Sequence, residues 1–335
     1  MLRIRVQTEK EEAKILSEFA TLSTQSRGRL IEELPCDIRT CYQRDRDRII
    51  HSKAFRRLMH KTQVFLSPEG DHYRTRLTHT LEVAQISRTI ARALKLNEDL
   101  TEAIALGHDL GHTPFGHCGE VALNDVHHEG FKHNVQSLRV VDLIEKRNNK
   151  IGLNLTHEVR DGILNHSGPH IPYTMEGQIV RLSDRIAYIN HDIDDAIRAG
   201  VLNFNDIPKT YIETFGDTSS KRINAMILNV ITHSQGKDTI QMEEAFHKQM
   251  LSLRQYMFKH VYLNESAKSE EKKAEKIIKT LYKYYLENPD ILEAHYDDYM
   301  TDAPLDQVIK DYIAGMSDRY IVQKYNEIFI PKFWT

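Results

Sequence analysis

The chain has 335 residues, of which 40% are hydrophobic and 28% are charged, and its formal net charge at pH 7 is −3. This length and composition allow a large buried core, either as one big domain or as a core with an appended part. The small negative charge argues against a protein that coats nucleic acid along its whole surface, because such binding needs many Lys and Arg contacts to phosphates.

No run of about 18 apolar residues occurs, and the first residues are too charged for the apolar core of a signal peptide. We therefore expect a soluble, cytoplasmic protein without a membrane segment. The three cysteines, Cys36, Cys41 and Cys118, form no CxxC pair. An odd number without such a pair indicates small reduced side chains rather than a disulfide framework or a thiolate zinc site.

An all-α fold is predicted, since helical periodicity runs along most of the chain and only 15 Gly and 9 Pro interrupt it. The alternating Val, Ile and Thr runs that strands need are missing from the sequence. Three regions are expected: an N-terminal segment over residues 1–36, a core over residues 37–205, and a C-terminal helical region over residues 206–335 that packs on the core.

The first marked feature along the chain is a basic stretch. Between Arg39 and Lys61 there are eight Lys or Arg and two Asp, which gives a local charge of +6. Such a stretch could face phosphates. The alternation RDRDR fits equally well a solvated helix face with Arg–Asp pairs, so charge alone leaves both interpretations open.

Two helices with candidate ligands follow. Apolar residues at helical spacing predict a helix that has Thr78 as its N-cap and His79 in its first turn. Asn97 is expected to cap the next helix, which carries acidic residues in its first turn. That helix ends at His108 and Asp109.

A loop must come next. The run GHTPFG, from Gly111 to Gly116, interrupts the helical pattern because Pro114 lacks an amide donor and restricts the residue before it. Beyond Gly177 an apolar stripe predicts a long helix, whose other face carries a polar stripe. That polar stripe contains Asp184, Tyr188, Asp192 and Asp195. Helical periodicity also covers residues 242–258 and 274–285.

The distribution of histidines along the chain indicates where a chemical site is expected. Fourteen of the 18 histidines lie between His51 and His191. Histidines interleaved with Asp and Glu in this way are typical of metal sites. The predicted ligands are His79, His108, Asp109 and Asp184. Two imidazoles and two carboxylates suit Mn²⁺, Mg²⁺, Fe or Zn²⁺, with positions left open for water or phosphate.

The order H, HD, D of these four residues resembles the ligand pattern of the HD superfamily of metal-dependent phosphohydrolases. The resemblance extends over about residues 44 to 200 and is most specific in the run HDLGHTPFGH. Five stretches are similar to the deoxyguanosine triphosphate triphosphohydrolase branch: DRDRIIHSKAFRRLMHKTQVF, GDHYRTRLTHTLEVAQIS, HDLGHTPFGHCGE, FKHNVQSLRVV and RLSDRIAYINHDIDDAIRAG. The resemblance implies a helical HD-domain core with an additional C-terminal helical region.

The resemblance also implies a reaction. It is the hydrolysis of deoxynucleoside triphosphates, dGTP or several dNTPs, at the α-phosphorus, which releases the deoxynucleoside and inorganic tripolyphosphate. We expect Mn²⁺ or Mg²⁺ as the divalent metal ion, with Fe, Ni, Co and Zn also compatible. The family forms homo-oligomers and is often activated by a dNTP at a second, allosteric site, so a tetramer or hexamer is expected. Nucleic acid is a possible partner but not a required one.

By the same resemblance, His117 and Glu120 supply the proton chemistry. They lie three residues apart and share one face if a helix follows Gly116. Glu120 is expected to hold His117, which either protonates the departing 5′ oxygen or orders the attacking water. His112 and His133 match family positions near the phosphates, as donors to the triphosphate rather than metal ligands.

Cations are needed for the four negative charges of the triphosphate. Arg76 and Arg185 come from the two helices that carry ligands, and both are assigned to phosphate. Arg57, with its neighbour Arg56, completes the phosphate end or serves a regulatory nucleotide site, and the sequence leaves both roles open.

Two further polar residues belong to the long helix. Tyr188 and Asp192 follow Asp184 by one and two turns, where the family pattern places groups that contact the sugar. Without the resemblance, both would be interpreted as part of a polar surface stripe.

Two other motif interpretations fail. Gly111 to Gly116 has the spacing of a P-loop, but a His-Cys pair stands where Lys-Ser/Thr should follow. His157-Glu158 lacks the second His of H-E-x-x-H, since position 161 is Asp. Two alternatives stay open. One is another HD-type nucleotide phosphohydrolase or phosphodiesterase, although no GYP tripeptide follows the HD pair. The other is a non-catalytic nucleotide-sensing or nucleic-acid-binding protein that uses the basic stretch.

Overall fold

The computed structural model describes residues 4–63, 74–148, 150–262, 265–293 and 303–332. Helices make up nearly all of its regular structure. Within these ranges, the strands are one short antiparallel pair, β1 (Lys146–Arg147) and β2 (Lys150–Ile151), in which Lys146 pairs with Ile151. The prediction of an all-α fold is therefore confirmed.

The chain divides into two compact units, each built from three separated stretches of sequence. The first unit comprises residues 1–51, 79–108 and 154–264, and the second comprises residues 52–78, 109–153 and 265–335. His108 is thus the last residue of a stretch in the first unit, and Asp109 is the first residue of a stretch in the second. The predicted region boundaries after residues 36 and 205 stay a prediction.

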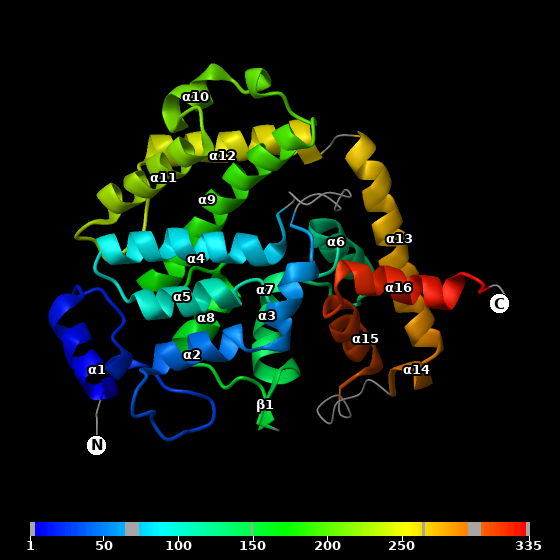
Figure 1. Cartoon of the computed structure of the whole chain (residues 1–335), viewed down its shortest axis with the longest axis horizontal. Helices are drawn as coiled ribbons and strands as arrows, with labels where there is room; N and C mark the ends of the chain where they lie inside the picture. Colours follow the sequence, from blue (N-terminus) through cyan, green and yellow to red (C-terminus); the bar gives the residue numbers. More distant parts are fainter. Residues whose placement is uncertain (1–3, 64–73, 149, 263–264, 294–302, 333–335) are drawn as a thin grey trace. The chain divides into compact units, whose positions relative to one another are not determined.

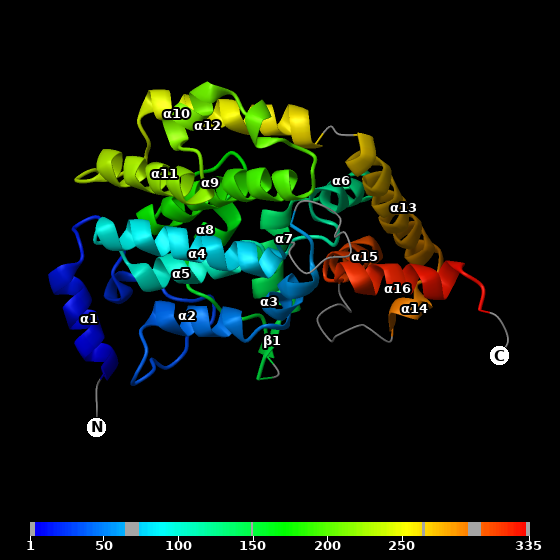
Figure 2. The same ribbon diagram turned by 45° about the horizontal axis from the view of Figure 1, so that its top comes forward.

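In the first unit, α5 is the helix against which α2, α8 and α9 pack (Figures 1 and 2). The helices of this unit are α1 (Ile4–Ile15), α2 (Cys41–Ile50), most of α4 (Arg76–Ala93), α5 (Glu98–Gly107), α8 (His157–Asn165), α9 (Met175–Arg198), α10 (Lys209–Phe215), α11 (Ser219–Ser234) and α12 (Glu244–Met257). Short turns add η1 (Ser23–Gln25), η4 (Phe204–Asp206) and the π-helical η5 (Phe258–Tyr262). The periodicity over residues 242–258 correctly predicted α12.

Close packing between α5 and α8 fixes the end of α5. A Cβ on Gly107 would lie 2.6 Å from Cδ1 of Ile163, and a Cβ on Gly162 would lie 2.6 Å from Cδ1 of Ile104. Each glycine therefore makes room for an isoleucine of the facing helix, and both isoleucines are fully buried. This contact holds the C-terminal end of α5, whose C-cap is His108.

Local sequence signals set the starts of the helices that carry candidate ligands. The Asn97 side chain accepts a hydrogen bond from a first-turn backbone N–H at 3.1 Å, so the predicted cap of α5 is confirmed. The predicted cap of α4 is wrong by a few residues, because α4 already begins at Arg76. Thr78 lies in its first turn, where Thr78 N donates to Thr75 Oγ1 at 3.4 Å. His79 still lies near the start of the helix, as predicted.

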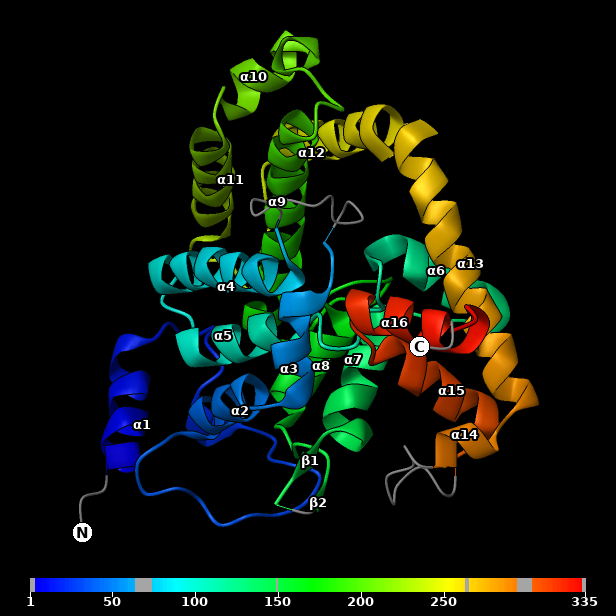
Figure 3. The same cartoon turned by 45° about the vertical axis from the view of Figure 1, so that its right-hand side comes forward.

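In the second unit, α13 packs against α6, α15 and α16 (Figure 3). The elements of this unit are α3 (Lys53–Arg57), η2 (Leu58–His60), α6 (Gly116–Val126), α7 (His133–Arg139), the π-helical η3 (Val140–Ile144), the two strands, α13 (Glu265–Glu287), α14 (Asp290–Glu293), α15 (Leu305–Ala314) and α16 (Asp318–Phe329). The helix predicted over residues 274–285 lies within α13.

The core of the second unit joins the middle of the chain to its C-terminal region. Leu123 of α6 packs in one apolar cluster with Ile278 and Leu281 of α13 and with Ile309 and Ile313 of α15, and all five are buried. Because α6 also carries His117 and Glu120, the C-terminal helices support the helix on which candidate catalytic residues lie.

We expect Gly162→Ala to lower the free energy of unfolding by about 1–3 kcal/mol, because the added methyl group overpacks the contact with Ile104. The higher helix propensity of Ala acts in the opposite direction and does not offset this loss. Urea unfolding followed by circular dichroism measures the change. As a control, Glu213→Ala at an exposed position of α10 should change stability by no more than about 0.5 kcal/mol. A Gly162→Ala protein more stable than the wild type would contradict the close approach of α5 and α8.

Candidate metal and phosphate site

Three of the predicted metal ligands meet in the first unit: His79 near the start of α4, His108 at the end of α5, and Asp184 on α9. His79 Nε2 lies 3.0 Å from Asp184 Oδ1, and His108 Nε2 lies 3.8 Å from the same oxygen. Both imidazoles are 1% exposed, whereas the Asp184 side chain is 25% exposed. Two buried imidazole nitrogens therefore converge on a carboxylate that solvent reaches, a donor set that divalent transition metals accept.

A backbone carbonyl orients the His108 imidazole. His108 Nδ1 lies 2.6 Å from the Ala105 carbonyl oxygen. A carbonyl can only accept, so Nδ1 carries the proton and Nε2 presents a lone pair toward Asp184. Ligand histidines in metal sites are commonly held in this way through their second nitrogen. The tautomer of His108 therefore fits a metal ligand.

Two histidines that were not among the predicted ligands border this cluster. The His166 ring lies 5.0 Å from the His108 ring, and the His191 ring lies 5.7 Å from the His79 ring. His191 follows Asp184 by seven residues on α9, so helical periodicity could have placed both on one face. His166 comes from the end of α8, and no local pattern relates it to the other two helices.

Asp109, the fourth predicted ligand, follows His108 directly and belongs to the second unit. Arg76 Nη1 donates to Asp109 Oδ2 at 2.6 Å, and the two side chains are 4% and 5% exposed. A carboxylate buried to this extent needs a compensating positive charge, because burial removes its hydration. The Arg76 guanidinium supplies that charge here, and a divalent cation would satisfy the same requirement.

The predicted loop between α5 and α6 is confirmed, and glycine is required at its start. A Cβ on Gly111 would lie 2.2 Å from the backbone nitrogen of Ser137, and Gly111 N donates to Ser137 Oγ at 2.9 Å. Phe115 has a φ of 62°, and its N–H donates to Asp318 Oδ1 of α16 at 2.9 Å. The loop is thus fastened at one end to α7 and at the other to the C-terminal region.

Lys61, which was predicted only as part of the basic stretch, is buried and binds the backbone of this loop. Its ammonium donates to the carbonyl oxygen of His112 at 2.5 Å and to that of Ala314 at 2.8 Å. Burial, reinforced by the nearby Arg57 guanidinium, lowers the pKa of Lys61 to about 7. No local pattern predicts this contact, because Ala314 lies more than 250 residues further along the chain.

Glu120 lies in the first turns of α6, as predicted, but its closest partner is His133 rather than His117. The backbone N–H and the Nδ1 atom of His133 each lie 3.0 Å from Glu120 Oε1. His117 Nδ1 lies 3.9 Å from Glu120 Oε2, and its side chain is 79% exposed. Glu120 therefore primarily fixes His133, at the start of α7, while His117 faces solvent.

The two histidines near the predicted phosphate position have pKa values that are shifted in opposite directions. Burial, together with the Arg76 guanidinium, holds the pKa of His112 well below its ordinary value. Burial also disfavours a charged His133, but the hydrogen bond and charge of Glu120 outweigh it and raise the pKa of His133. The rings are stacked, with centroids 5.0 Å apart. A neutral imidazole therefore lies beside one that is ready to carry a proton.

The pKa of Glu120 is also shifted by the groups around it. Burial favours its protonated form, yet the nearby His117 and the hydrogen bonds with His133 prevail and hold the pKa of Glu120 far below its usual range. Ligand atoms of His112, Glu120 and His133 lie within 4.8 Å of one another, so this group could itself hold a cation. Their expected role toward phosphate stays a prediction.

The remaining predicted substrate residues fall into two places. Arg185, Tyr188 and Asp192 lie on α9 with Asp184. Burial, opposed by the Asp184 carboxylate, lowers the pKa of Arg185, and Asp192 is 1% exposed. Arg57 lies elsewhere, on α3 of the second unit, where Nη1 donates to the Gly315 carbonyl at 3.2 Å. The contact of these residues with substrate stays a prediction.

Comparison with known proteins places the chain in a family. Residues 76–189 match the HD domain model and residues 240–327 match the phosphohydrolase-associated domain model. A deoxyguanosinetriphosphate triphosphohydrolase-like protein of Caldanaerobacter subterraneus subsp. tengcongensis is 56% identical, over 99% of this chain and 98% of that protein. One of Desulfatibacillum aliphaticivorans is 49% identical, over 98% and 99% of the two chains.

The chain is therefore an HD-domain phosphohydrolase. It belongs to the family of deoxyguanosinetriphosphate triphosphohydrolase-like proteins, as the resemblance of its motifs predicted. A solved phosphohydrolase of Bacteroides thetaiotaomicron shares the fold, with a TM-score of 0.53 at 19% identity over 84% of this chain and 69% of that one. In the part of the chain that the structure describes, no helix combines the length and apolar character needed to cross a membrane.

We expect Glu120→Gln to lower the pKa of His133, because the amide removes the negative charge that favours the imidazolium. An NMR titration of the His133 ring protons measures this pKa in the wild type and the variant. Glu129→Gln, a matched substitution of an exposed glutamate 69% open to solvent, should leave the His133 titration unchanged. An equal pKa in the wild type and Glu120→Gln would contradict the assigned hydrogen bond.

The same bond should make stability depend on pH in a defined direction. Because the pKa of folded His133 is raised above its ordinary value of 6.5, its pairing with Glu120 stabilises the fold fully below about pH 6.5. This contribution is lost as pH rises through the pKa of folded His133. Urea unfolding across that window should show a smaller loss in Glu120→Gln than in the wild type.

Proposed function

We propose that this HD-domain phosphohydrolase hydrolyses deoxynucleoside triphosphates, dGTP or several dNTPs, to the deoxynucleoside and inorganic tripolyphosphate. The observation that carries the proposal is the convergence of His79 and His108 on Asp184, with Asp109 next in sequence to His108. The names of two relatives that align with nearly the whole chain support this substrate class.

His79, His108, Asp109 and Asp184 would hold one divalent ion. Mn²⁺ and Mg²⁺ suit the two carboxylates best, and Fe, Ni, Co and Zn also accept this mixed donor set. Held by these residues, such an ion would supply positive charge to the α-phosphoryl oxygens and a water of lowered pKa. A cation bound to Asp109 would compensate the carboxylate in place of Arg76. The Arg76 guanidinium would then be able to bind a phosphate.

The protein's own groups supply the remaining charge and protons. His112, neutral and held by its buried position, donates one N–H to a phosphate oxygen. His133, whose affinity for a proton Glu120 raises, adds a positive charge close by when it is protonated. His117 either protonates the departing 5′ oxygen or orders the attacking water. Its exposed side chain lies in the first turn of α6, where Nδ1 is 3.9 Å from Glu120 Oε2.

Substrate recognition is assigned to the helices that carry the ligands. Arg76 and Arg185 bind the triphosphate, because guanidinium groups match phosphate oxygens in geometry and charge. Tyr188 and Asp192, one and two turns beyond Asp184 on α9, contact the sugar. Homo-oligomer formation as a tetramer or hexamer, activation by a dNTP and a cytoplasmic location stay predictions from the sequence.

Product analysis tests the proposed reaction. Incubation of the protein with Mn²⁺ or Mg²⁺ and each dNTP, singly and in pairs, should release deoxynucleoside and tripolyphosphate in equal amounts. Ion-exchange chromatography or ³¹P NMR identifies the products. Release of monophosphate and pyrophosphate would favour another HD-type activity, and no turnover with any dNTP mixture would favour a nucleotide sensor.

Removal of a ligand tests the metal site independently of substrate choice. His108→Ala and Asp184→Ala should bind less than one tenth of the metal that the wild type retains, and their turnover should fall by at least about a hundredfold. Metal content is measured by plasma mass spectrometry after dialysis. His170→Ala, an exposed histidine of the same unit, is the matched control. Full metal content in both ligand variants would overturn the assignment.

A further inference from the structure

Two consecutive histidines of the second unit, His127 and His128, face one carboxylate in the first turn of α15. His127 is the C-cap of α6, where its N–H donates to the Leu123 carbonyl at 3.0 Å. His128 Nδ1 lies 2.5 Å from Asp306 Oδ2, and His127 Nδ1 lies 3.7 Å from the same oxygen. One ligand atom from each of the three side chains lies within 4.8 Å of the other two. Two imidazoles and a carboxylate therefore converge where α6 ends and α15 begins.

The turn that carries the two histidines is held in place by its own hydrogen bonds. Gly130 has a φ of 70°, and its N–H donates to the His127 carbonyl at 2.8 Å. Glycine adopts this conformation without steric cost. Asn124 Oδ1 accepts the N–H of Phe131 at 3.0 Å, and a Cβ on Gly130 would lie 2.8 Å from that oxygen. These contacts preorganise the backbone from which both histidines project.

His127 is a buried imidazole that hydrogen bonds do not fully satisfy. Its side chain is 1% exposed, whereas that of His128 is 68% exposed. Nδ1 lies 3.0 Å from the Tyr282 hydroxyl oxygen, but Nε2 has no hydrogen-bond partner among the described residues. Buried polar atoms are normally paired, so one nitrogen without a partner is a cost that a stronger bond at the ring would offset. A surface ion pair between His128 and Asp306 alone leaves the burial of His127 unexplained.

The distances fit a small metal ion after a movement of one side chain. Metal–nitrogen and metal–oxygen bonds of about 2.0–2.2 Å place neighbouring ligand atoms roughly 3.0–3.5 Å apart. The 3.7 Å between His127 Nδ1 and Asp306 Oδ2 is close to this separation. His128 Nδ1 is too close to the same oxygen and would move away by roughly 1 Å. Its exposed side chain has room for that movement.

Glu129 places a second carboxylate beside His128. Its Oε1 lies 3.8 Å from His128 Nε2, whereas Nδ1 of the same ring faces Asp306. Histidines that bind a metal through one nitrogen commonly present the other nitrogen to a carboxylate, which orients the ring and raises its basicity. His128 therefore lies between a candidate ligand and a carboxylate that would orient it.

Lys310 is a positive charge near the cluster. It follows Asp306 by one turn of α15, and its ammonium lies 4.0 Å from Asp311 Oδ1. The carboxylates of Asp306 and Glu129 together exceed this single charge. Burial and the Lys310 ammonium, opposed by Asp306, lower the pKa of His127. Its imidazole is therefore neutral near pH 7 and has a lone pair, as a metal ligand requires.

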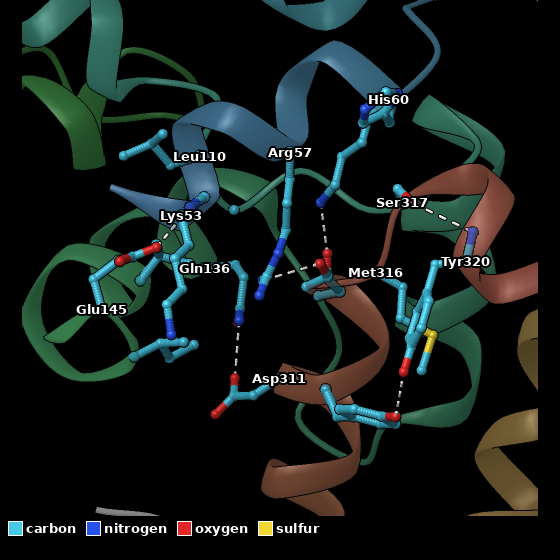
Figure 4. Close-up of a pocket in the computed structure, with 18 of the residues that line it drawn as sticks. Lys53, Arg57, His60, Leu110, Gln136, Glu145, Asp311, Met316, Ser317 and Tyr320 are labelled. Carbon is cyan, nitrogen blue, oxygen red and sulfur yellow. Dashed lines mark hydrogen bonds between the residues drawn. The ribbon is translucent and has the colours of Figure 1, made fainter. Parts of the chain in front are cut away.

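A metal ion at this position would fasten the start of α15. The later turns of this helix are already attached to other elements. Asp311 accepts a hydrogen bond from Gln136 Nε2 at 2.9 Å (Figure 4). The Ala314 carbonyl accepts one from the Lys61 ammonium at 2.8 Å. In the first turn, Asp306 pairs with the two histidines, so an ion bound among them would join the end of α6 to the C-terminal region.

We propose that His127, His128 and Asp306 form an additional metal site, which binds a divalent transition metal ion such as Zn²⁺, Ni²⁺ or Cu²⁺ and joins α6 to α15. Two imidazoles suit these ions better than Mg²⁺ or Mn²⁺, which prefer oxygen ligands. An ion on His127 Nδ1 replaces the Tyr282 hydroxyl there, because the coordinate bond is stronger than a neutral hydrogen bond. The site shares no residue with the four predicted metal ligands and does not depend on the proposed reaction.

Zinc titration of the full chain tests this site in a background that lacks the first cluster, His108→Ala/Asp184→Ala. We expect the background to bind Zn²⁺ in competition with a chromophoric chelator. The further substitutions His128→Ala and Asp306→Asn should together remove one bound Zn²⁺ per chain, or weaken its binding by at least about a hundredfold, because two ligands are lost. His127 stays intact because it is buried. A background that binds no Zn²⁺, or equal binding with and without the two substitutions, would overturn the proposal.

Two substitutions outside the cluster are matched controls. Asp125→Asn changes a half-exposed carboxylate of α6 that pairs with Lys279 at 2.8 Å, two residues before His127. His60→Ala removes an exposed histidine of η2 in the same unit. Both should bind Zn²⁺ within about twofold of the background, because neither contributes a ligand. A loss in Asp125→Asn as large as that in Asp306→Asn would indicate a general effect of charge and contradict a ligand role for Asp306.

Thermal unfolding separates a built site from adventitious binding. An ion that binds the folded chain raises Tm by mass action. Excess Zn²⁺ should raise the Tm of the background and leave it unchanged once His128→Ala and Asp306→Asn are added. Matching far-UV circular dichroism without metal establishes that both proteins are folded. Equal increases in Tm would show that Zn²⁺ binds elsewhere and would refute the site.

The outcome is distinguishable from the test of the proposed function. Loading with Mn²⁺ or Mg²⁺, which prefer oxygen ligands, reports on the first cluster, whereas Zn²⁺ binding in the background reports on His127, His128 and Asp306. Absence of dNTP turnover in the wild type would refute the proposed reaction and leave the zinc measurements unaffected. Full turnover in the wild type, together with no Zn²⁺ bound by the background, would refute the additional site alone.

Discussion

The ion pair between Arg76 and Asp109 is the interaction that allows this protein to bury its polar centre. Both side chains are almost fully enclosed and lie 2.6 Å apart, and a buried carboxylate of this kind is tolerated only when an opposite charge or several donors compensate it. Asp109 cannot be separated from His108, because the two are consecutive. The end of α5 must therefore deliver an imidazole and a carboxylate together, and the guanidinium at the start of α4 balances the carboxylate. A cation at the same carboxylate would compensate Asp109 in place of Arg76, and the buried guanidinium would then need an anion of its own.

The C-terminal helices belong to the candidate site through the core that they share with α6. Leu123 packs with Ile278 and Ile309, and Asp318 of α16 accepts the Phe115 N–H at the end of the His112 loop. The region that matches the phosphohydrolase-associated domain thus supports the loop directly, by apolar burial behind α6 and by hydrogen bonds to its backbone. Loss of these helices would leave the helix of Glu120 without one side of its core, which explains physically why the two matched domains occur in one chain.

Proton placement in the second unit follows from which buried group has a partner. His112 is enclosed beside the positive Arg76 and stays neutral, whereas His133 is enclosed beside the negative Glu120 and gains affinity for a proton. Two stacked imidazoles therefore differ in their affinity for a proton although both are buried. The same reasoning applies to Lys61, whose enclosure lowers its pKa to about 7 while two carbonyls hold its ammonium. The loop that carries His112 is consequently bordered by buried groups whose pKa values the fold shifts.

The sequence by itself determined the helical fold and the cap of α5, because these depend on periodicity and on local capping residues. It determined the loop before α6, because Gly and Pro limit the backbone there. It also predicted the residues that converge on Asp184, because the family shares the order of these motifs. It did not determine that Glu120 binds His133 more closely than His117, that His166 and His191 border the ligands, or that Lys61 reaches Ala314. Those contacts join residues from 13 to more than 250 positions apart. Apart from the shared face of Asp184 and His191 on α9, the spacing of residues along one helix contains no information about them. Only the tertiary packing brings such groups together, and it decides their charge as well, since the pKa of a buried group depends on the partner that the fold places beside it.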